Sequence, residues 1–141
     1  MATISIPPNG LEGAAEIYRE NILDHYKNPH NRGQLAQPTV QHKEYNTLCG
    51  DAVALTLSIS GNTITDIKFL GNGCAISQAA TSMLTDLVKG KSLSAVEHIT
   101  ADDIRGLLSI PLSPVRLKCA LLSLDTLKKA LQTYKETYGR P

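Results

Sequence analysis

The sequence predicts an α+β fold in which helices pack on a small, mainly antiparallel sheet, and three observations support this prediction. One segment alternates strictly between apolar and polar residues, which is typical of a half-buried strand. Three longer segments repeat their apolar residues at helical spacing. Aromatic residues make up only 4% of the chain, with no Trp and one Phe, so the core must consist of Leu, Ile, Val and Ala.

The first half of the chain contains one helix and one hairpin. Apolar residues at three- and four-residue steps predict a helix over residues 11–26, and the aperiodic residues 30–40 predict a loop. Residues 51–60 alternate, Gly61-Asn62 suits a two-residue turn, and residues 63–70 resume a β-rich composition. We therefore expect a β-hairpin over these two segments.

The second half is predicted to be helical. An apolar stripe from Ile76 to Leu87 indicates a helix that begins just after Cys74, at a strand-to-helix junction. Short apolar pairs indicate one or two short helices within residues 91–110. Ser113-Pro114 is a strong helix start, and the stripe that follows predicts a long last helix reaching Tyr134.

Length and charge restrict the organisation and the partners. At 141 residues and 15.2 kDa, the chain has room for one domain, which we place at residues 11–141 after a flexible lead-in at residues 1–10. The formal net charge is +1, so we expect no nucleic-acid partner. The sequence contains neither a long apolar run nor a signal-peptide pattern, so we expect no membrane partner and a cytoplasmic location, where cysteines stay as thiols.

Two of the three cysteines lie near predicted strand ends. If the strand that contains Asp51 also includes Cys49, both side chains point to the same face and can converge on one ion. Cys74 lies where the backbone N–H groups of a helix N-terminus stabilise a thiolate. Free cysteine is also among the most buried residue types, so a structural role is the alternative for each cysteine alone.

Cys119 has two cations close to it in sequence, Arg116 and Lys118. They favour a thiolate or an incoming anionic group if the side chains point the same way. The three thiolates together with the carboxylate of Asp51 would suit a tetrahedral Zn²⁺ ion or an iron-sulfur cluster. Because oxygen holds soft iron less firmly than sulfur does, such a site favours exchange of its cargo over storage.

Five segments in a fixed order resemble a known family. They are IYRENILDHYKNPHNRG, NTLCGDAVAL, FLGNGCAISQAATSML, KGKSL and SPVRLKCALLSLDTLKKAL, which together span residues 17–131. The chain resembles the iron-sulfur cluster assembly scaffolds of the IscU, SufU and NifU N-terminal type. The resemblance implies a SufE/NifU-like fold with a three-stranded sheet, and a ligand set of Cys49, Asp51, Cys74 and Cys119.

The resemblance also implies a function. Such a scaffold accepts sulfur from a pyridoxal-phosphate cysteine desulfurase, assembles a transient [2Fe-2S] cluster and passes it to apo recipient proteins. It is a scaffold and sulfur acceptor rather than an enzyme with turnover of its own. Because Arg116 and Lys118 lie beside Cys119 on what we expect to be an exposed first turn, we expect Cys119 to receive the sulfur first. A frataxin-like protein and an Hsp70-type chaperone are further implied partners, and the chain is expected to be a monomer or a homo-oligomer.

Three departures from the family pattern keep two alternatives open. IscU-type members carry His before the last cysteine, where this chain has Lys118, and IPLSPVR only partly resembles the chaperone-binding LPPVK stretch. Arg116 and Lys118 look like the SufU type, yet the segment between Gly90 and Cys119 is too short for the extra stretch that SufU-type members usually carry. The alternatives are a zinc-dependent SufU-type sulfurtransferase and a non-catalytic structural zinc module. We expect the protein to carry Zn²⁺ as isolated.

The four histidines have no cysteine motif beside them. We expect them at the surface or at helix ends rather than at a metal. They are His25, His30, His42 and His98.

Overall fold

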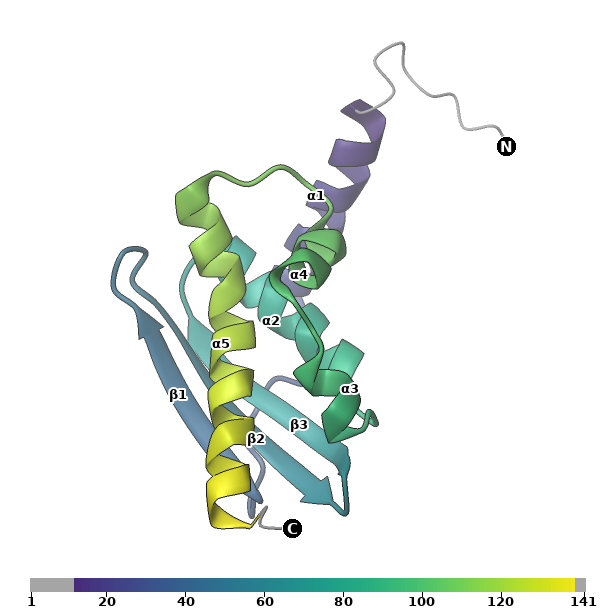
Figure 1. Ribbon diagram of the computed structural model, residues 1–141. Coiled ribbons are helices and arrows are strands. Elements are labelled where there is room, and N and C mark those ends of the chain that lie inside the picture. The colour runs from purple at the N-terminus through teal and green to yellow at the C-terminus, as the bar shows by residue number, and fades with distance from the viewer. Residues whose placement is uncertain (1–11, 139–141) are drawn as a thin grey trace, which may run out of the picture.

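The computed structural model describes residues 12–138, and it confirms the α+β fold with a three-stranded antiparallel sheet and a long last helix (Figure 1). The lead-in predicted for residues 1–10 lies outside the described residues. The strands β1 (Val40–Asn46), β2 (Asp51–Ser60) and β3 (Thr63–Asn72) lie in that order in the sheet. The helices are α1 (Glu12–Lys27), α2 (Ala75–Val88), α3 (Leu93–Glu97), α4 (Ala101–Leu108) and α5 (Pro114–Thr137).

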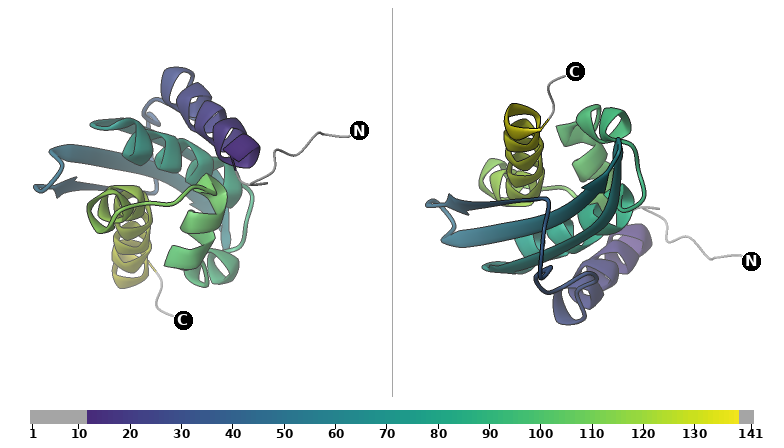
Figure 2. Two further views of the ribbon diagram at one scale, coloured as in Figure 1. Left: turned by 90° about the horizontal axis from the view of Figure 1, so that it is seen from above. Right: turned by 90° about the horizontal axis from the view of Figure 1, so that it is seen from below.

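Helices α2 and α5 pack on the sheet, and α1 packs on α2, so that α2 lies between α1 and α5 (Figure 2). Helix α5 runs across β1 and β2, whereas α2 packs on β3. Because α2 has neighbours on most sides, its buried surface is wider than the single apolar stripe that the sequence predicts. Some of its buried hydroxyls bond inside the helix, as where Thr81 Oγ1 donates to the Ser77 carbonyl at 2.7 Å, whereas the buried Ser82 hydroxyl accepts the His30 backbone N–H from the loop after α1.

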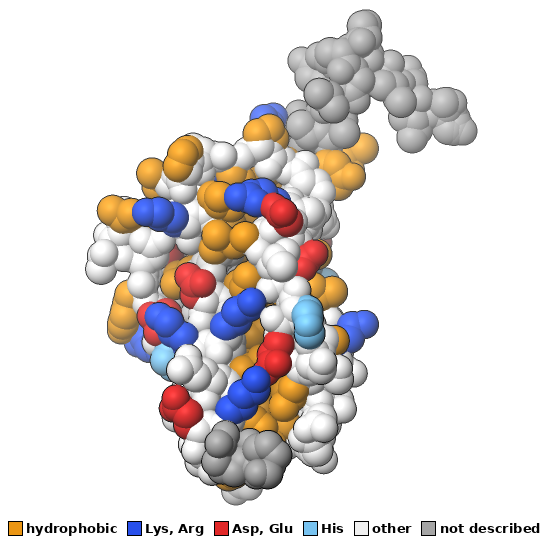
Figure 3. Space-filling model, viewed as in Figure 1, with side chains coloured by type: hydrophobic (Ala, Val, Ile, Leu, Met, Phe, Trp, Pro, Cys, Tyr) orange, Lys and Arg blue, Asp and Glu red, His pale blue; other side chains and the backbone are white. Residues whose placement is uncertain are grey.

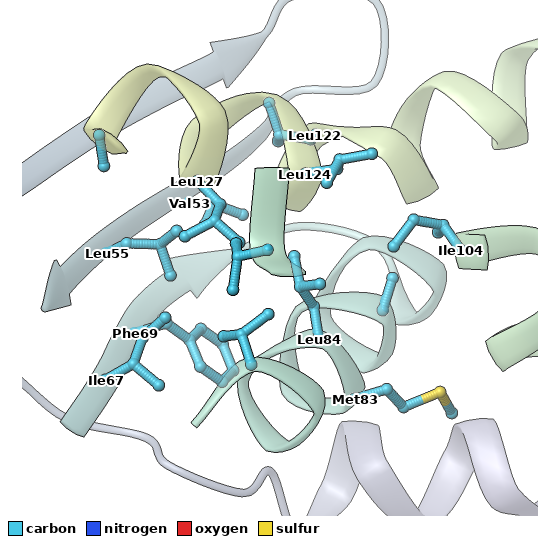
Figure 4. Close-up of a cluster of buried hydrophobic side chains, with 14 of the residues drawn as sticks. Val53, Leu55, Ile67, Phe69, Met83, Leu84, Ile104, Leu122, Leu124 and Leu127 are labelled. Atoms are coloured by element: carbon cyan, nitrogen blue, oxygen red, sulfur yellow. The ribbon is translucent and has the colours of Figure 1, made fainter. Parts of the chain in front are cut away.

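The core lies between the sheet and these two helices (Figure 4). The inward residues of the alternating segment meet leucines of α2 and α5, as the sequence pattern requires. Each fully buried aliphatic or aromatic side chain contributes about 1.5–3 kcal/mol relative to its exposed state. The largest members of this core include Val53, Leu55, Ile67, Phe69, Leu84 and Leu127.

Strand β1 is an element that the sequence pattern does not reveal. Its alternate residues face α5, but the middle two, His42 and Glu44, are polar. Nε2 of His42 lies 2.6 Å from Oε2 of Glu44, and the Lys129 ammonium of α5 lies 3.3 Å from the same oxygen. Polar contacts thus join this edge strand to the last helix. The sequence of β1 therefore lacks the alternating apolar residues by which a strand is recognised.

Helix α5 carries a charged outer face. It begins as predicted, because Ser113 is the N-cap, whose Oγ accepts the Arg116 N–H at 3.2 Å, and Pro114 follows in the first turn. Blue and red side chains cover the front of α5 in Figure 3. The exposed charged residues of this helix are Arg116, Lys118, Asp125, Lys128, Lys129, Lys135 and Glu136. Among residues 12–138, no helix has a stretch long and apolar enough to cross a membrane.

Candidate metal centre

Asp51 and Cys74 form the centre of the candidate site. Asp51 is the first residue of β2 and is fully buried, whereas Cys74 is half-buried and is the N-cap of α2. The Cys74 backbone N–H donates to Oδ1 of Asp51 at 2.9 Å, and its Sγ lies 3.4 Å from Oδ2. The strand-to-helix junction therefore holds a carboxylate and a thiol side by side.

Gly73 makes this close approach possible. Its φ of +137° lies in a region that L side chains rarely adopt, and an added Cβ would overlap Asp51, at 2.6 Å from its Cγ and 2.9 Å from its Cα. The site therefore requires glycine at this position. The sequence pattern shows Gly73 only as a break before Cys74, and its role depends on the position of a carboxylate 22 residues earlier in the chain.

Cys49 lies in the turn between β1 and β2, not in the strand itself. The Gly50 N–H donates to the Asn46 carbonyl at 2.8 Å, and the Leu48 N–H donates to the Asn46 side chain at 2.9 Å. Gly50 supplies the positive φ of +70° that closes this turn. The turn, rather than strand alternation, brings Cys49 towards Asp51, so the expectation of a shared strand is wrong.

Cys119 approaches from α5 and is joined to Cys49 in a disulfide, with the two Cα atoms 6.7 Å apart. The sequence predicts three thiols, but in this structure Cys74 is the one free cysteine. The disulfide forms because its two cysteines are close together. The turn between β1 and β2 (residues 47–50, called here the hairpin turn) and α5 place ligand atoms of Cys49, Asp51 and Cys119 within 4.8 Å of one another. The same proximity is what a shared metal ion needs once the disulfide is reduced.

The environment of Cys119 differs from the exposed first turn that the sequence suggests. Its side chain is fully buried in the second turn of α5, whereas Arg116 and Lys118 are exposed. Lys118 lines a hollow of about 420 Å³ together with Thr47 and Leu48 of the hairpin turn. The two cations therefore lie on the surface around the site, and Cys119 lies beneath it.

The donor set fits a thiolate metal site. The sulfurs of Cys49 and Cys119 and an oxygen of Asp51 lie within 4.8 Å of one another, and Cys74 joins this group only through Asp51, with its Sγ 3.4 Å from Oδ2. Three thiolates and one carboxylate suit the tetrahedral preference of Zn²⁺ and the thiolate ligation of iron-sulfur clusters. Cys49 and Cys74 are both half-buried, so the site opens to solvent on one side.

A family model described as the NifU-like N terminal domain matches residues 17–140. The chain belongs to this family. The resemblance that the five sequence segments carry is thereby confirmed. Within the NifU-like family, the zinc-dependent sulfurtransferase SufU of Bacillus subtilis (strain 168) is 36% identical over 132 residues, covering 82% of this chain and 89% of the relative.

Other members of the NifU-like family carry scaffold names. The iron-sulfur cluster assembly scaffold protein IscU of Rickettsia prowazekii (strain Madrid E) is 36% identical over 126 residues, covering 84% of this chain and 92% of the relative. A crystal structure of a protein assigned as an iron-sulfur cluster assembly scaffold for the SUF system, from Fervidobacterium islandicum AW-1, superimposes with a TM-score of 0.70 at 31% identity, covering 84% of this chain and 99% of that one. The N-terminal part of a NifU-like protein from Brucella abortus shares the fold, with a TM-score of 0.72 at 22% identity, covering 87% of this chain and 97% of that one.

Proposed function

We propose that this NifU-like chain is an iron-sulfur cluster assembly scaffold that accepts sulfur from a cysteine desulfurase, builds a [2Fe-2S] cluster and passes it to recipient proteins. The cluster is held by Cys49, Cys74 and Cys119, with Asp51 as an oxygen ligand. The buried carboxylate of Asp51 carries the proposal, because it lies within 4.8 Å of the sulfurs of Cys49 and Cys119 and its Oδ2 lies 3.4 Å from Sγ of Cys74. Because oxygen is the weaker ligand for iron, the cluster is cargo and not a resident cofactor.

Sulfur arrives by transfer between thiols. In the reduced protein, the Cys119 thiolate attacks the outer sulfur of the desulfurase persulfide, the sulfur-sulfur bond breaks, and the desulfurase cysteine leaves as a thiolate. Cys119 is then the persulfide, and an external reductant supplies the electrons that convert its sulfur to cluster sulfide. Since Cys119 is buried beneath the hairpin turn, residues 47–50 must move aside for this step.

The surface around the site suits a docking desulfurase. Leu48 is 67% exposed and Val115 is 52% exposed, and hydrophobic side chains gather over the hairpin turn and the start of α5 in Figure 3. Arg116 and Lys118 add positive charge there, which attracts an anionic persulfide. An apolar patch with a charged rim is typical of a protein-binding surface.

The remaining partners and the location follow from the same site. The segment 110–116, which leads into α5, is mostly exposed, which supports recognition by an Hsp70-type chaperone. A frataxin-like protein is a further partner of this proposed function. The metal-binding form needs reduced thiols, which supports a cytoplasmic location.

A second candidate function is that of a zinc-dependent sulfurtransferase. It is favoured by Arg116 and Lys118, which are exposed beside the cysteines, and by the 36% identity to the zinc-dependent sulfurtransferase SufU of Bacillus subtilis. In this case the same four residues hold Zn²⁺, and sulfur passes over the protein without cluster assembly.

Anaerobic reconstitution tests both functions. The reduced, metal-free protein is incubated with a cysteine desulfurase, cysteine, Fe²⁺ and a reductant, and a parallel sample is first loaded with zinc. A [2Fe-2S] absorption spectrum that Cys74→Ser abolishes supports the scaffold. Zinc retained while desulfurase turnover rises supports the sulfurtransferase. If the protein retains zinc, forms no cluster and does not raise desulfurase turnover, both functions are contradicted and the structural zinc module is the remaining explanation.

A further inference from the structure

A second group of potential metal ligands lies at the opposite end of α2. His25 is near the end of α1, His30 follows in the next loop, and Asp86 is on α2. Their ligand atoms lie within 4.8 Å of one another. Asp86 is twelve residues after Cys74, which on a helix corresponds to about 18 Å along the axis, so this group is separate from the cysteines.

Neighbouring side chains hold all three ligands in place. Nδ1 of His25 lies 2.8 Å from the Ser82 hydroxyl, and the same hydroxyl accepts the His30 backbone N–H at 2.8 Å. Nδ1 of His30 lies 2.5 Å from Oδ2 of Asp86, while the Asn31 amide donates to Oδ1 at 2.9 Å. The contacts with Ser82 and Asn31 come from outside the group and are of the kind that orients ligands in natural metal sites, whereas the His30–Asp86 contact joins two of the potential ligands.

The electrostatics favour a bound cation. The two imidazole rings are 4.4 Å apart, so they repel each other when both are protonated. The carboxylates of Asp24 and Asp86 supply negative charge beside the rings.

We propose that His25, His30 and Asp86 form a second metal site that binds a divalent first-row transition ion through two imidazoles and one carboxylate, without any cysteine. Imidazole and carboxylate ligands suit Zn²⁺ and Fe²⁺. Both His30 and Asp86 have side chains that are about half exposed, so the ion reaches the site from solvent and retains open coordination positions. In this proposal His25 and His30 are metal ligands, in contrast to the expectation from their sequence context.

Calorimetric titration of the reduced, metal-free full chain with Zn²⁺ tests this site, with NMR of the histidine rings as the local readout. We expect two equivalents, because the thiolate site fills first and the second equivalent then shifts the signals of His25 and His30. His30→Gln retains a hydrogen-bonding side chain beside Asp86 but removes the imidazole. This variant should lower the affinity for the second zinc equivalent at least tenfold and leave the affinity for the first unchanged. Changes to residues that only support metal ligands already lower metal affinity roughly 10–100-fold.

His98→Gln is the matched control, since this histidine is the C-cap of α3 and its Nδ1 lies 2.7 Å from the Ser94 carbonyl oxygen. It should leave both equivalents unchanged. Asp86→Asn provides an independent variant if His30→Gln unfolds. The proposal is overturned if one equivalent binds, if the second equivalent leaves the two ring signals unmoved, or if the control weakens it as much as His30→Gln does. The group would then be only a hydrogen-bonded joint between α1 and α2.

Discussion

The thiol of Cys74 and the carboxylate of Asp51 are in direct contact, with Sγ 3.4 Å from Oδ2. The other carboxylate oxygen accepts the backbone N–H of Cys74 at 2.9 Å. One oxygen of Asp51 is therefore engaged by the backbone, and the other is available to a metal beside the sulfur. A ligand that is hydrogen-bonded in this way has a resting position when the metal leaves, which suits a site that releases its cargo.

Replacing Asp51 should lengthen the lifetime of a bound cluster. Asp51→Ala and Asp51→Asn both remove the charged oxygen ligand, which slows exchange and hydrolytic attack. We expect cluster loss under chelator challenge to slow roughly tenfold, or about 1.4 kcal/mol in the barrier, as followed by visible absorbance. Asp125→Asn, an exposed aspartate of α5, is the control and should decay like the wild type. Unchanged or faster loss in both Asp51 variants would argue against this role.

Gly73→Ala should disrupt the site more than its backbone strain alone explains. Its Cβ would overlap Asp51, so the carboxylate must leave its position beside Cys74. Gly90→Ala is the matched control, because Gly90 also has a positive φ, of +84°, but has open space around it. We expect the control to lose about 1–2 kcal/mol of unfolding free energy and to retain full zinc affinity. Gly73→Ala should lose more stability and at least tenfold in zinc affinity by competition with a chelator; equal zinc affinity in the two variants would show that the overlap does not matter.

Cys119 should be the cysteine that first carries persulfide. The positive charge of Arg116 and Lys118 draws the donor to this part of the surface, although Cys119 itself is buried. Brief reaction of the reduced protein with a desulfurase and cysteine, followed by alkylation and mass mapping, gives the position of the added sulfur. If the added sulfur is found first on Cys49 or Cys74, the more exposed cysteines, that residue and not Cys119 is the acceptor.

The contact between β1 and α5 should make stability dependent on acid pH. The hydrogen bond with His42, assisted by Lys129, lowers the pKa of Glu44 below its usual 4.5. A carboxyl whose folded pKa is lowered stabilises the fold above its unfolded pKa, and this stabilisation is lost as the pH falls through the folded value. Glu44→Gln should therefore cost about 0.5–1 kcal/mol at pH 7, and this cost should disappear as the pH falls through the lowered pKa of Glu44. Denaturant melts across this range decide it, with the exposed Glu20→Gln as control; a cost for Glu44→Gln that does not vary with pH would be contrary to this account.

The sequence predicts those elements whose burial follows a simple period. The alternation of residues 51–60 and the Gly61-Asn62 turn predict the hairpin, and β2 and β3 have these bounds to within two residues. Strand β1 escapes prediction because its inward residues His42 and Glu44 bond to each other and to α5 instead of forming an apolar face.

The site residues can be named from the sequence, but their contacts cannot. Asp51 at the start of β2 and Cys74 at the start of α2 are 23 residues apart in the chain, but the two ends lie together in space. Cys119 reaches them from a helix 70 residues after Cys49. These distances in space cannot be predicted from the spacing of the residues along the chain. The requirement for Gly73 and the burial of Cys119 depend on the same packing, so they appear only in three dimensions.

The central claim is that Cys49, Asp51, Cys74 and Cys119 share one metal ion in the reduced protein. X-ray absorption at the zinc edge, on protein loaded with one equivalent of Zn²⁺, reads this ligand set directly. We predict three sulfurs at about 2.3 Å and one oxygen at about 2.0–2.2 Å, with the oxygen altered in Asp51→Ala. A first shell with fewer than three sulfurs, or one that Asp51→Ala leaves unchanged, would contradict the claim.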